Sequence, residues 1–388
     1  MRKTWLHDLT LSAAVAGFVA VLVGFTSSVA IVFQAAQALG ATPAQTSSWM
    51  WALGLGMGIT SLGLSLWTRQ PVLTAWSTPG AALLAGTAGL SMPEAIGAFI
   101  VCAVLIILFG VTRWFERVMD RIPLAVASAL LAGVLARFGL DAVMTVQSAP
   151  LMVLVMAIAY LLGKRFIPRY AVPGVLLAGV AVAATQGRLR LGAVDWSWAQ
   201  PVWTTPVFSL AALVGVALPL FLVTMASQNL PGVAAQRASG YQTPVSASIT
   251  VTGLASLLLA PFGGYAFNLA AITAAICMGR EAHEEPARRY TAAVMAGLFY
   301  IAVGLAGGAV VGLLVAFPRE LVAAVAGLAL LGTIAGGLSA ALNDEKHRDA
   351  AILTFLVTLS GVSLLGIGSA FWGVVAGSAA LLVARLRA

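Results

Sequence analysis

The chain has 388 residues, of which 61% are hydrophobic and only 9% are charged, and its mean hydropathy is +0.99. A soluble domain carries about 25% charged residues, so this composition excludes a soluble protein. Apolar runs of about 18 or more residues recur along the chain, which is typical of a polytopic α-helical membrane protein and not of a β-barrel, whose strands alternate. The net charge of +8 comes from short loops between these runs, so it does not indicate a nucleic-acid partner.

Fourteen apolar segments follow one another and are predicted to be membrane spans. Their approximate bounds are 9–39, 44–68, 71–90, 92–113, 122–138, 149–164, 167–186, 206–236, 243–261, 262–279, 289–316, 320–341, 349–366 and 369–386. If the N-terminus is cytoplasmic, all of the 21 lysines and arginines except Arg137, Arg188, Arg190 and Arg319 fall on the cytoplasmic side. This asymmetry follows the positive-inside rule and predicts a multi-pass protein of a bacterial inner membrane with both termini in the cytoplasm.

The two halves of the chain share a weak repeat that pairs the first segment with the eighth. Identical residues at an offset of about 200 pair Leu22, Val23, Ser27, Ala35, Ala38 and Gly40 with Leu222, Val223, Ser227, Ala235, Ala238 and Gly240. An odd number of spans separates the two segments, so the halves would cross the membrane in opposite directions. A seven-plus-seven inverted repeat of this kind is typical of secondary transporters. Chance similarity in a chain rich in Ala, Gly and Leu is the alternative.

The third and tenth segments are predicted to be short strands that lead into half-helices. Pro71–Trp76 is expected to be extended, and Ser77-Thr78-Pro79-Gly80 is a strong helix-start signal. In the tenth segment, Pro261–Phe267 cannot begin a helix, and Asn268 is the expected N-cap of a helix over Leu269–Met278. Each helical piece would be roughly 15 Å long, about half the thickness of the hydrocarbon layer, so both helices would begin near the middle of the membrane.

Two half-helix N-termini that face one cavity would form an anion site. Each N-terminus carries unpaired backbone N–H groups and a partial positive charge, so an anion can bind without Lys or Arg. No basic residue lies between Lys3 and Arg69, as this arrangement allows. The alternative is that the two broken segments are irregular for packing alone.

The polar and aromatic residues near this meeting point are the candidate substrate ligands. Adjacent Gln228 and Asn229 each need several hydrogen-bond partners, and Leu230-Pro231-Gly232 after them is expected to kink or end the eighth segment. An aromatic substrate could stack between Trp76 and Phe267, which hold matched places in the two strands. The full set is Ser27, Ser28, Thr74, Trp76, Ser77, Thr78, Gly80, Gln228, Asn229, Phe267, Asn268 and Leu269. The alternative for each is a structural role in its own helix or in the core.

Titratable groups are scarce in the predicted spans. No acidic residue lies between Asp195 and Glu281, and all three histidines lie at span edges. Glu94 and Glu281, both at span ends, are therefore the candidate proton-coupling residues, unless the substrate carries its own proton. With no cluster of metal ligands and no acidic pair within a span, we expect no catalytic residue, metal or cofactor.

Taken together, the fourteen spans, the inverted repeat and the broken third and tenth segments resemble the fold of nucleobase transporters and sulfate permeases. More narrowly, Ser227–Gly232, Pro261–Gly264 and Asn268–Ile276 resemble the benzoate–proton symporter family. The resemblance implies a core domain made of residues 1–115 and 206–316, and a gate domain made of residues 116–205 and 317–388. The nucleobase branch carries acidic residues in spans 8 and 10, where this chain has Gln228, Asn229 and Asn268, which leaves room for an anion.

This resemblance leads us to expect a secondary active transporter, not an enzyme, that imports benzoate or a similar aromatic carboxylate with protons by alternating access of the core against the gate. The expected partners are that substrate, protons and the lipid bilayer, with a homodimer as an open option. A transporter or channel for another small anion, such as sulfate or bicarbonate, is the alternative.

Overall fold

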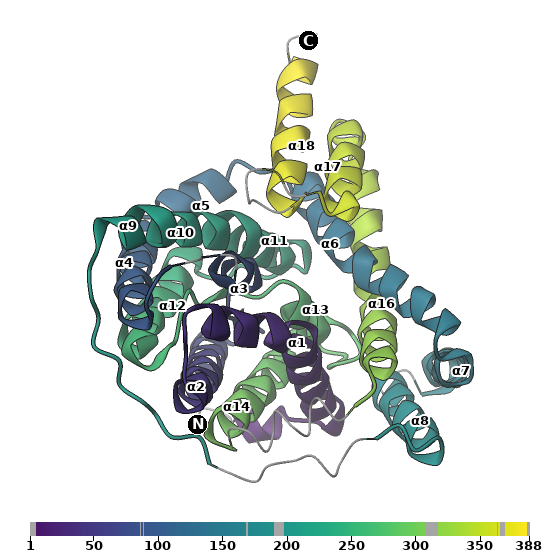
Figure 1. Ribbon diagram of the computed structural model, residues 1–388. Coiled ribbons are helices and arrows are strands. Elements are labelled where there is room, and N and C mark those ends of the chain that lie inside the picture. The colour runs from purple at the N-terminus through teal and green to yellow at the C-terminus, as the bar shows by residue number, and fades with distance from the viewer. Residues whose placement is uncertain are drawn as a thin grey trace.

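The computed structural model describes residues 5–85, 87, 89–167, 170–189, 198–306, 317–362, 364 and 369–385. These residues form a helical protein with one short strand pair (Figure 1). The elements of the first half are α1 (Leu11–Ala38), α2 (Pro43–Thr68), β1 (Thr74–Ala75), α3 (Thr78–Ala85), α4 (Met92–Val111), α5 (Trp114–Met119), α6 (Leu124–Met144), α7 (Pro150–Phe166) and α8 (Ala171–Thr185). Those of the second half are α9 (Leu210–Ala212), α10 (Leu218–Thr224), α11 (Leu230–Ala238), α12 (Val245–Leu259), β2 (Asn268–Leu269), α13 (Ile272–Met278), α14 (Tyr290–Ala306), α16 (Arg319–Asn343), α17 (Arg348–Ser360) and α18 (Ser369–Arg385).

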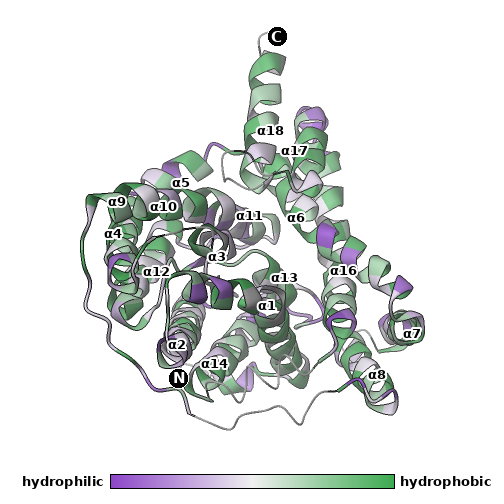
Figure 2. Ribbon diagram, viewed as in Figure 1, coloured by the Kyte–Doolittle hydropathy of each residue, from purple (hydrophilic) through white to green (hydrophobic). Residues whose placement is uncertain are grey.

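Each of the fourteen predicted segments corresponds to an element in this order. Seven helical stretches among the described residues are long and apolar enough to cross a membrane. The remaining segments are shorter or interrupted, and β1–α3 and β2–α13 replace full spans as predicted. Large apolar side chains such as Leu108, Leu154, Leu177 and Leu258 are exposed on the helices. Figure 2 shows that most of the ribbon has the colour of apolar residues, as expected for helices that contact lipid.

The helices form two groups. The central bundle consists of α1–α4 and α9–α14, and the flanking bundle consists of α6–α8 and α16–α18 (Figure 1). In the central bundle α2 packs along α14 and α4 packs along α12. The predicted repeat exchanges these two pairs, and it likewise exchanges α7·α8 with α17·α18 in the flanking bundle. The packing therefore has the twofold pattern that the inverted repeat predicts.

Close approach of α2 and α14 depends on glycine. A Cβ on Gly54 would lie 2.6 Å from the Cα of Gly304, and a Cβ on Gly58 would lie 2.7 Å from the carbonyl oxygen of Gly297. Small residues let two helix backbones come close together. Such close packing stabilises helix pairs in a membrane, where the hydrophobic effect contributes little to their association.

The strand pair joins the two halves of the central bundle. β1 and β2 are antiparallel, with Thr74 opposite Leu269 and Ala75 opposite Asn268. Two residues per strand give a marginal pair, so the surrounding backbone groups need other partners. Ser61 of α2 accepts the N–H of Thr74 at 3.0 Å, and Ser256 of α12 accepts the N–H of Phe267 at 2.9 Å. The two halves thus support their strands in the same way.

The half-helices begin differently from one another. Ser77 caps α3 as predicted, because its Oγ accepts the N–H of Gly80 at 3.2 Å. The prediction that Asn268 is the N-cap of the second half-helix is wrong, because Asn268 lies in β2 and α13 begins at Ile272 after Ala271. The backbone just before α13 is hydrogen-bonded to the first half of the chain, because the N–H of Ala270 donates to the carbonyl oxygen of Leu73, next to β1, at 2.9 Å. The helix can therefore begin only after Ala270.

Two further expectations need correction. α6 continues past the predicted end at 138 to Met144, so Arg137 lies within a helix and not in an outer loop. Of the two outcomes expected at Pro231, a kink or an end, the end is wrong, because the helix continues to Ala238. A π-helical turn at Met225–Asn229 precedes the proline, and such a wide turn is one way in which a helix absorbs a missing hydrogen bond. Residues 307–316 of the predicted eleventh span lie outside the described residues.

Candidate functional site

A cavity of about 70 Å³ lies where the strand pair meets α1 and the start of α13. We call it the central cavity. It is lined by Val23, Gly24, Ser28, Met57, Ala75, Trp76, Thr78, Phe138, Gln228, Ala270, Ala271, Ile272, Thr273 and Tyr300. None of these described lining residues is Lys, Arg, His, Asp or Glu. The cavity therefore combines aromatic walls with neutral hydrogen-bonding groups.

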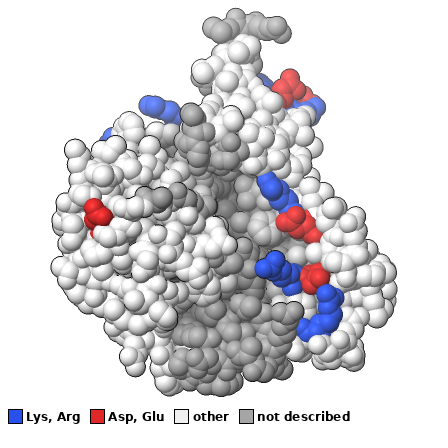
Figure 3. Space-filling view, in the orientation of Figure 1, with Lys and Arg blue, Asp and Glu red and all other residues white. Residues whose placement is uncertain are grey.

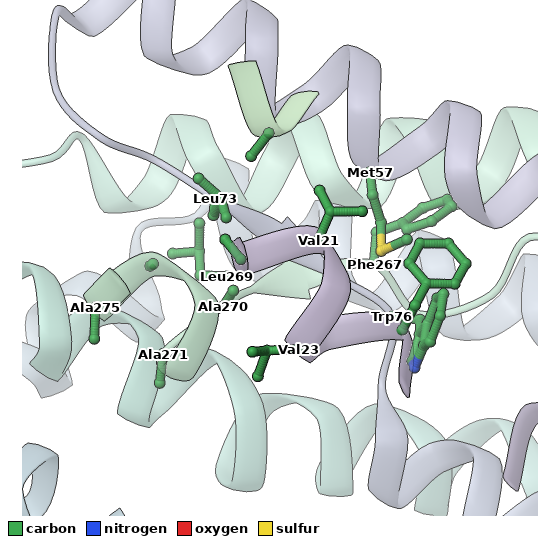
Figure 4. Close-up of a cluster of buried hydrophobic side chains, with 14 of the residues drawn as sticks. Val21, Val23, Met57, Leu73, Trp76, Phe267, Leu269, Ala270, Ala271 and Ala275 are labelled. Atoms are coloured by element: carbon green, nitrogen blue, oxygen red, sulfur yellow. The ribbon is translucent and has the colours of Figure 1, made fainter. Parts of the chain in front are cut away.

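Trp76 forms a fixed aromatic wall of the central cavity. Its indole N–H donates to Ser28 Oγ at 3.0 Å, and Ser28 Oγ donates to Gly24 O at 3.0 Å. The ring of Phe25 packs edge-on against Trp76 with 4.8 Å between centroids. In the view of Figure 4, Val23 lies between Trp76 on one side and Ala270 and Ala271 on the other. The polar atom of Trp76 is thus satisfied by the protein, which leaves an apolar surface for a ligand.

Four of the sequence-predicted ligands line the central cavity, namely Ser28, Trp76, Thr78 and Gln228. Seven others do not, namely Thr74, Ser77, Gly80, Asn229, Phe267, Asn268 and Leu269. The side chain of Ser27 lies outside the described residues.

Those that do not line the cavity mostly have structural contacts. Asn229 Oδ1 accepts the N–H of Leu269 at 2.9 Å and so holds β2. Thr74 Oγ1 donates to Met57 O at 3.0 Å, and Ser77 Oγ receives a hydrogen bond from Thr224 at 2.9 Å. Gly80 gives room to α10, because a Cβ there would lie 2.5 Å from Leu220 Cδ1.

Phe267 and Asn268 are both fully buried beside the strand pair. Phe267 packs on α2, where a Cβ on Gly56 would lie 2.2 Å from its ring, so it does not face Trp76 across the central cavity. Asn268 Nδ2 donates to Ala266 O at 3.1 Å, and its Oδ1 is buried with no hydrogen-bond partner.

Sequence reasoning missed four lining residues that carry distinctive chemistry or shape: Gly24, Phe138, Thr273 and Tyr300. Phe138 is the one described lining residue from the flanking bundle, and no local pattern links it to the broken segments. Tyr300 offered a signal, because a hydroxyl in the middle of an apolar span usually faces protein or a polar cavity.

A second cavity of about 700 Å³ lies at the other end of α13, between the two bundles. We call it the charged vestibule. Its lining includes Lys164, Arg280, Glu281, Glu284 and Arg289. Lys164 Nζ of the flanking bundle lies 3.9 Å from Glu281 Oε1 of the central bundle. Figure 3 shows that most charged side chains visible on this face of the molecule lie along the flanking bundle.

Arg289 closes the end of α13 that faces the charged vestibule. Its guanidinium donates to Met278 O and to His283 O, both at 2.8 Å. A positive charge at a helix C-terminus is favourable, so Arg289 fixes this half-helix at the end opposite the central cavity.

Glu94 lies at neither cavity. Its Oε2 accepts from the N–H and the hydroxyl of Ser91 at 3.1 and 2.7 Å, which forms a capping box at the start of α4. Within the described part of the chain, no group of three or more His, Cys, Asp or Glu residues could hold a metal.

One family model covers nearly the whole chain, and two relatives align with it over nearly their full length. The family model described as benzoate membrane transport protein matches residues 7–383. The inner membrane protein YdcO of Escherichia coli is 51% identical over 382 residues, covering 98% of each chain. The benzoate membrane transport protein of Acinetobacter baylyi is 41% identical over 382 residues, covering 98% of this chain and 97% of that one. Among solved structures, the transmembrane domain of the cyanobacterium bicarbonate transporter BicA aligns with a TM-score of 0.45 and 14% identity, covering 100% of this chain and 98% of that one.

Proposed function

Because the chain belongs to the benzoate membrane transport protein family, and so is a multi-pass membrane transporter and not an enzyme, we propose that it imports benzoate or a similar aromatic carboxylate together with protons. The protein lies in the bacterial inner membrane with both termini in the cytoplasm, and it transports the substrate across this membrane by alternating access. The central bundle is the core domain that holds the substrate, and the flanking bundle is the gate domain.

The observation that carries this proposal is the composition of the central cavity. An aromatic ring is accommodated by Trp76, Met57 and Phe138, while Thr78, Gln228 and the start of α13 offer neutral donors to a carboxylate. The half-helix adds a partial positive charge near Ala271 and Ile272. At the start of α3, Pro79 has no N–H and that of Gly80 is bound by Ser77, so α3 contributes less than α13.

The size of the central cavity supports movement of the gate. At about 70 Å³ it is smaller than the roughly 150 Å³ cavity that holds benzene in an engineered protein. Phe138 is contributed by α6 of the flanking bundle, so separation of the two bundles would withdraw this side chain and enlarge the cavity. Binding and gating would then share one residue.

Initial rates of labelled benzoate uptake into proteoliposomes test the proposal. With an acidic exterior, uptake should exceed that of protein-free liposomes, which measure passive entry of benzoic acid. Unlabelled benzoate on the inside should accelerate entry of the label by exchange. Excess sulfate or bicarbonate should not compete, and competition by either would favour the alternative of a different small anion.

Replacement of Glu281 by Gln is expected to reduce the stimulation of uptake by the pH gradient at least about fivefold while benzoate exchange persists. Glu281 has a side chain only 13% exposed and faces Lys164 of the other bundle, so its protonation would change the attraction between core and gate. Glu94→Gln is the matched control, because Glu94 serves as a helix cap. Full stimulation in Glu281→Gln would instead favour a proton carried by the substrate itself.

A further inference from the structure

Several polar groups in or beside the central cavity are already bound to the protein. Ser28 and Trp76 bind each other, Asn229 binds the backbone of β2, and Ser77 binds the backbone of α3. A group that already has its partners gains little from a ligand, whereas a buried group without partners carries a desolvation cost that a ligand can remove. The lining groups that have no hydrogen-bond partner are therefore the best candidates to bind a ligand.

Thr273 is such a group. It is only 6% exposed, it lines the central cavity, and its Oγ1 has no hydrogen-bond partner that meets normal geometry. The Tyr300 hydroxyl is its nearest protein neighbour of this kind but lies outside that geometry. Natural proteins rarely leave a buried hydroxyl unpaired, so a ligand that binds in the cavity could supply the missing partner. Thr273 lies in the first turn of α13, where this half-helix meets the central cavity.

Tyr300 of α14 brings a second hydroxyl to the same place. It is 1% exposed and also lines the central cavity. A Cβ on Gly24 would lie 3.0 Å from the Tyr300 hydroxyl oxygen and 3.2 Å from Cγ2 of Thr273, so both side chains meet over this glycine. Because Gly24 has no side chain, Tyr300 and Thr273 can both pack against α1 at this point.

We propose that the hydroxyls of Thr273 and Tyr300 form the binding site for the substrate's carboxylate, and that Gly24 lets both side chains take these positions against α1. This inference rests on the proposed function and deepens it, since it fixes the orientation of the substrate. The carboxylate faces Thr273 and Tyr300, and the ring extends toward Trp76 and Phe138.

Two hydroxyl donors suit a carboxylate for a physical reason. Each can donate one hydrogen bond to a carboxylate oxygen, and hydrogen bonds to an ionised acceptor are shorter and stronger than neutral ones. A neutral site holds the anion less tightly than a buried cation would, and a transporter must release its cargo. The site thereby recognises a carboxylate without Lys or Arg among the described lining residues.

The experiment measures the Kd for benzoate of purified wild-type protein and of the variants Thr273→Val and Tyr300→Phe. Each variant removes one hydroxyl and keeps the shape of the side chain, and each should weaken binding at least about tenfold. Binding of benzamide, a neutral molecule of the same shape, should change less. Gly24→Ala adds a methyl group 3.0 Å from the Tyr300 hydroxyl oxygen and 3.2 Å from Cγ2 of Thr273, so it should displace both side chains and weaken benzoate binding by a similar factor.

Tyr265→Phe and Thr358→Val are the matched controls. Both remove a buried hydroxyl that has no partner, at positions that do not line the central cavity, and both should leave the Kd unchanged. Thr273→Val and Tyr300→Phe with wild-type Kd values would overturn the inference, as would equal losses in the controls. Failure of the wild-type protein to bind benzoate would overturn the proposed function itself.

Discussion

Replacement of Trp76 by Ala is expected to raise the Kd for benzoate at least about a hundredfold while the protein stays folded. Trp76 is the largest side chain among the described lining residues, and its position is fixed by Ser28 and Phe25. An aromatic ligand loses both apolar burial and ring–ring contact when this side chain is removed. Equilibrium binding to the purified protein measures the change.

Two further substitutions define what this result means. Trp76→Phe keeps an aromatic face but loses the hydrogen bond to Ser28, so its Kd should lie between those of the wild type and the Ala variant. Trp67→Ala removes a tryptophan whose side chain is 64% exposed on α2, and it should bind benzoate normally. A Trp76→Ala variant that binds as tightly as Trp67→Ala would show that the ring of the substrate lies elsewhere.

Replacement of Asn229 by Leu should destabilise the protein by about 2–4 kcal/mol and abolish binding as a consequence. The fully buried Asn229 accepts the N–H of Leu269 through Oδ1. Leu would leave that N–H unpaired in the interior and would add apolar volume to a packed site. β2 has only two residues, so its displacement would move Ala270 and the start of α13. Thermal unfolding in detergent should show a midpoint at least about 5 °C lower.

The neighbouring Gln228 should behave in the opposite way. It lines the central cavity, so Gln228→Leu is expected to weaken benzoate binding with little change in the unfolding midpoint. Asn229→Asp retains an acceptor for Leu269 N–H and should be more stable than Asn229→Leu. An Asn229→Leu variant with a wild-type midpoint and reduced affinity would show that Asn229 acts as a ligand and not as a support for β2.

The broken third segment was predictable because its signals are local. Pro71 and Pro79 restrict the backbone, and Ser77 is a strong N-cap, so the sequence indicates both the strand and the helix start. The tenth segment was predictable in position but not in detail. Its helix starts at Ile272, not at Leu269, because β2 pairs with residues almost 200 positions earlier, and a local pattern contains no information on that pairing.

The sequence also could not show which candidate ligands line the cavity and which have structural roles. Gln228 and Asn229 are adjacent amides in one span, and sequence alone gives them the same role. The structure separates them because neighbouring residues of a helix point in different directions, here one to the cavity and one to β2. Thr273 was overlooked because a hydroxyl in an apolar helix usually bonds its own backbone, and only the fold shows that this one does not.

The central claim is that the substrate lies in the central cavity with its ring at Trp76 and its carboxylate at Thr273 and Tyr300. A density map of the protein with bound benzoate tests it most directly. We predict planar density beside Trp76, with its carboxylate end at the two hydroxyls above Gly24. Benzoate density in the charged vestibule beside Lys164, with the central cavity empty, would contradict the account.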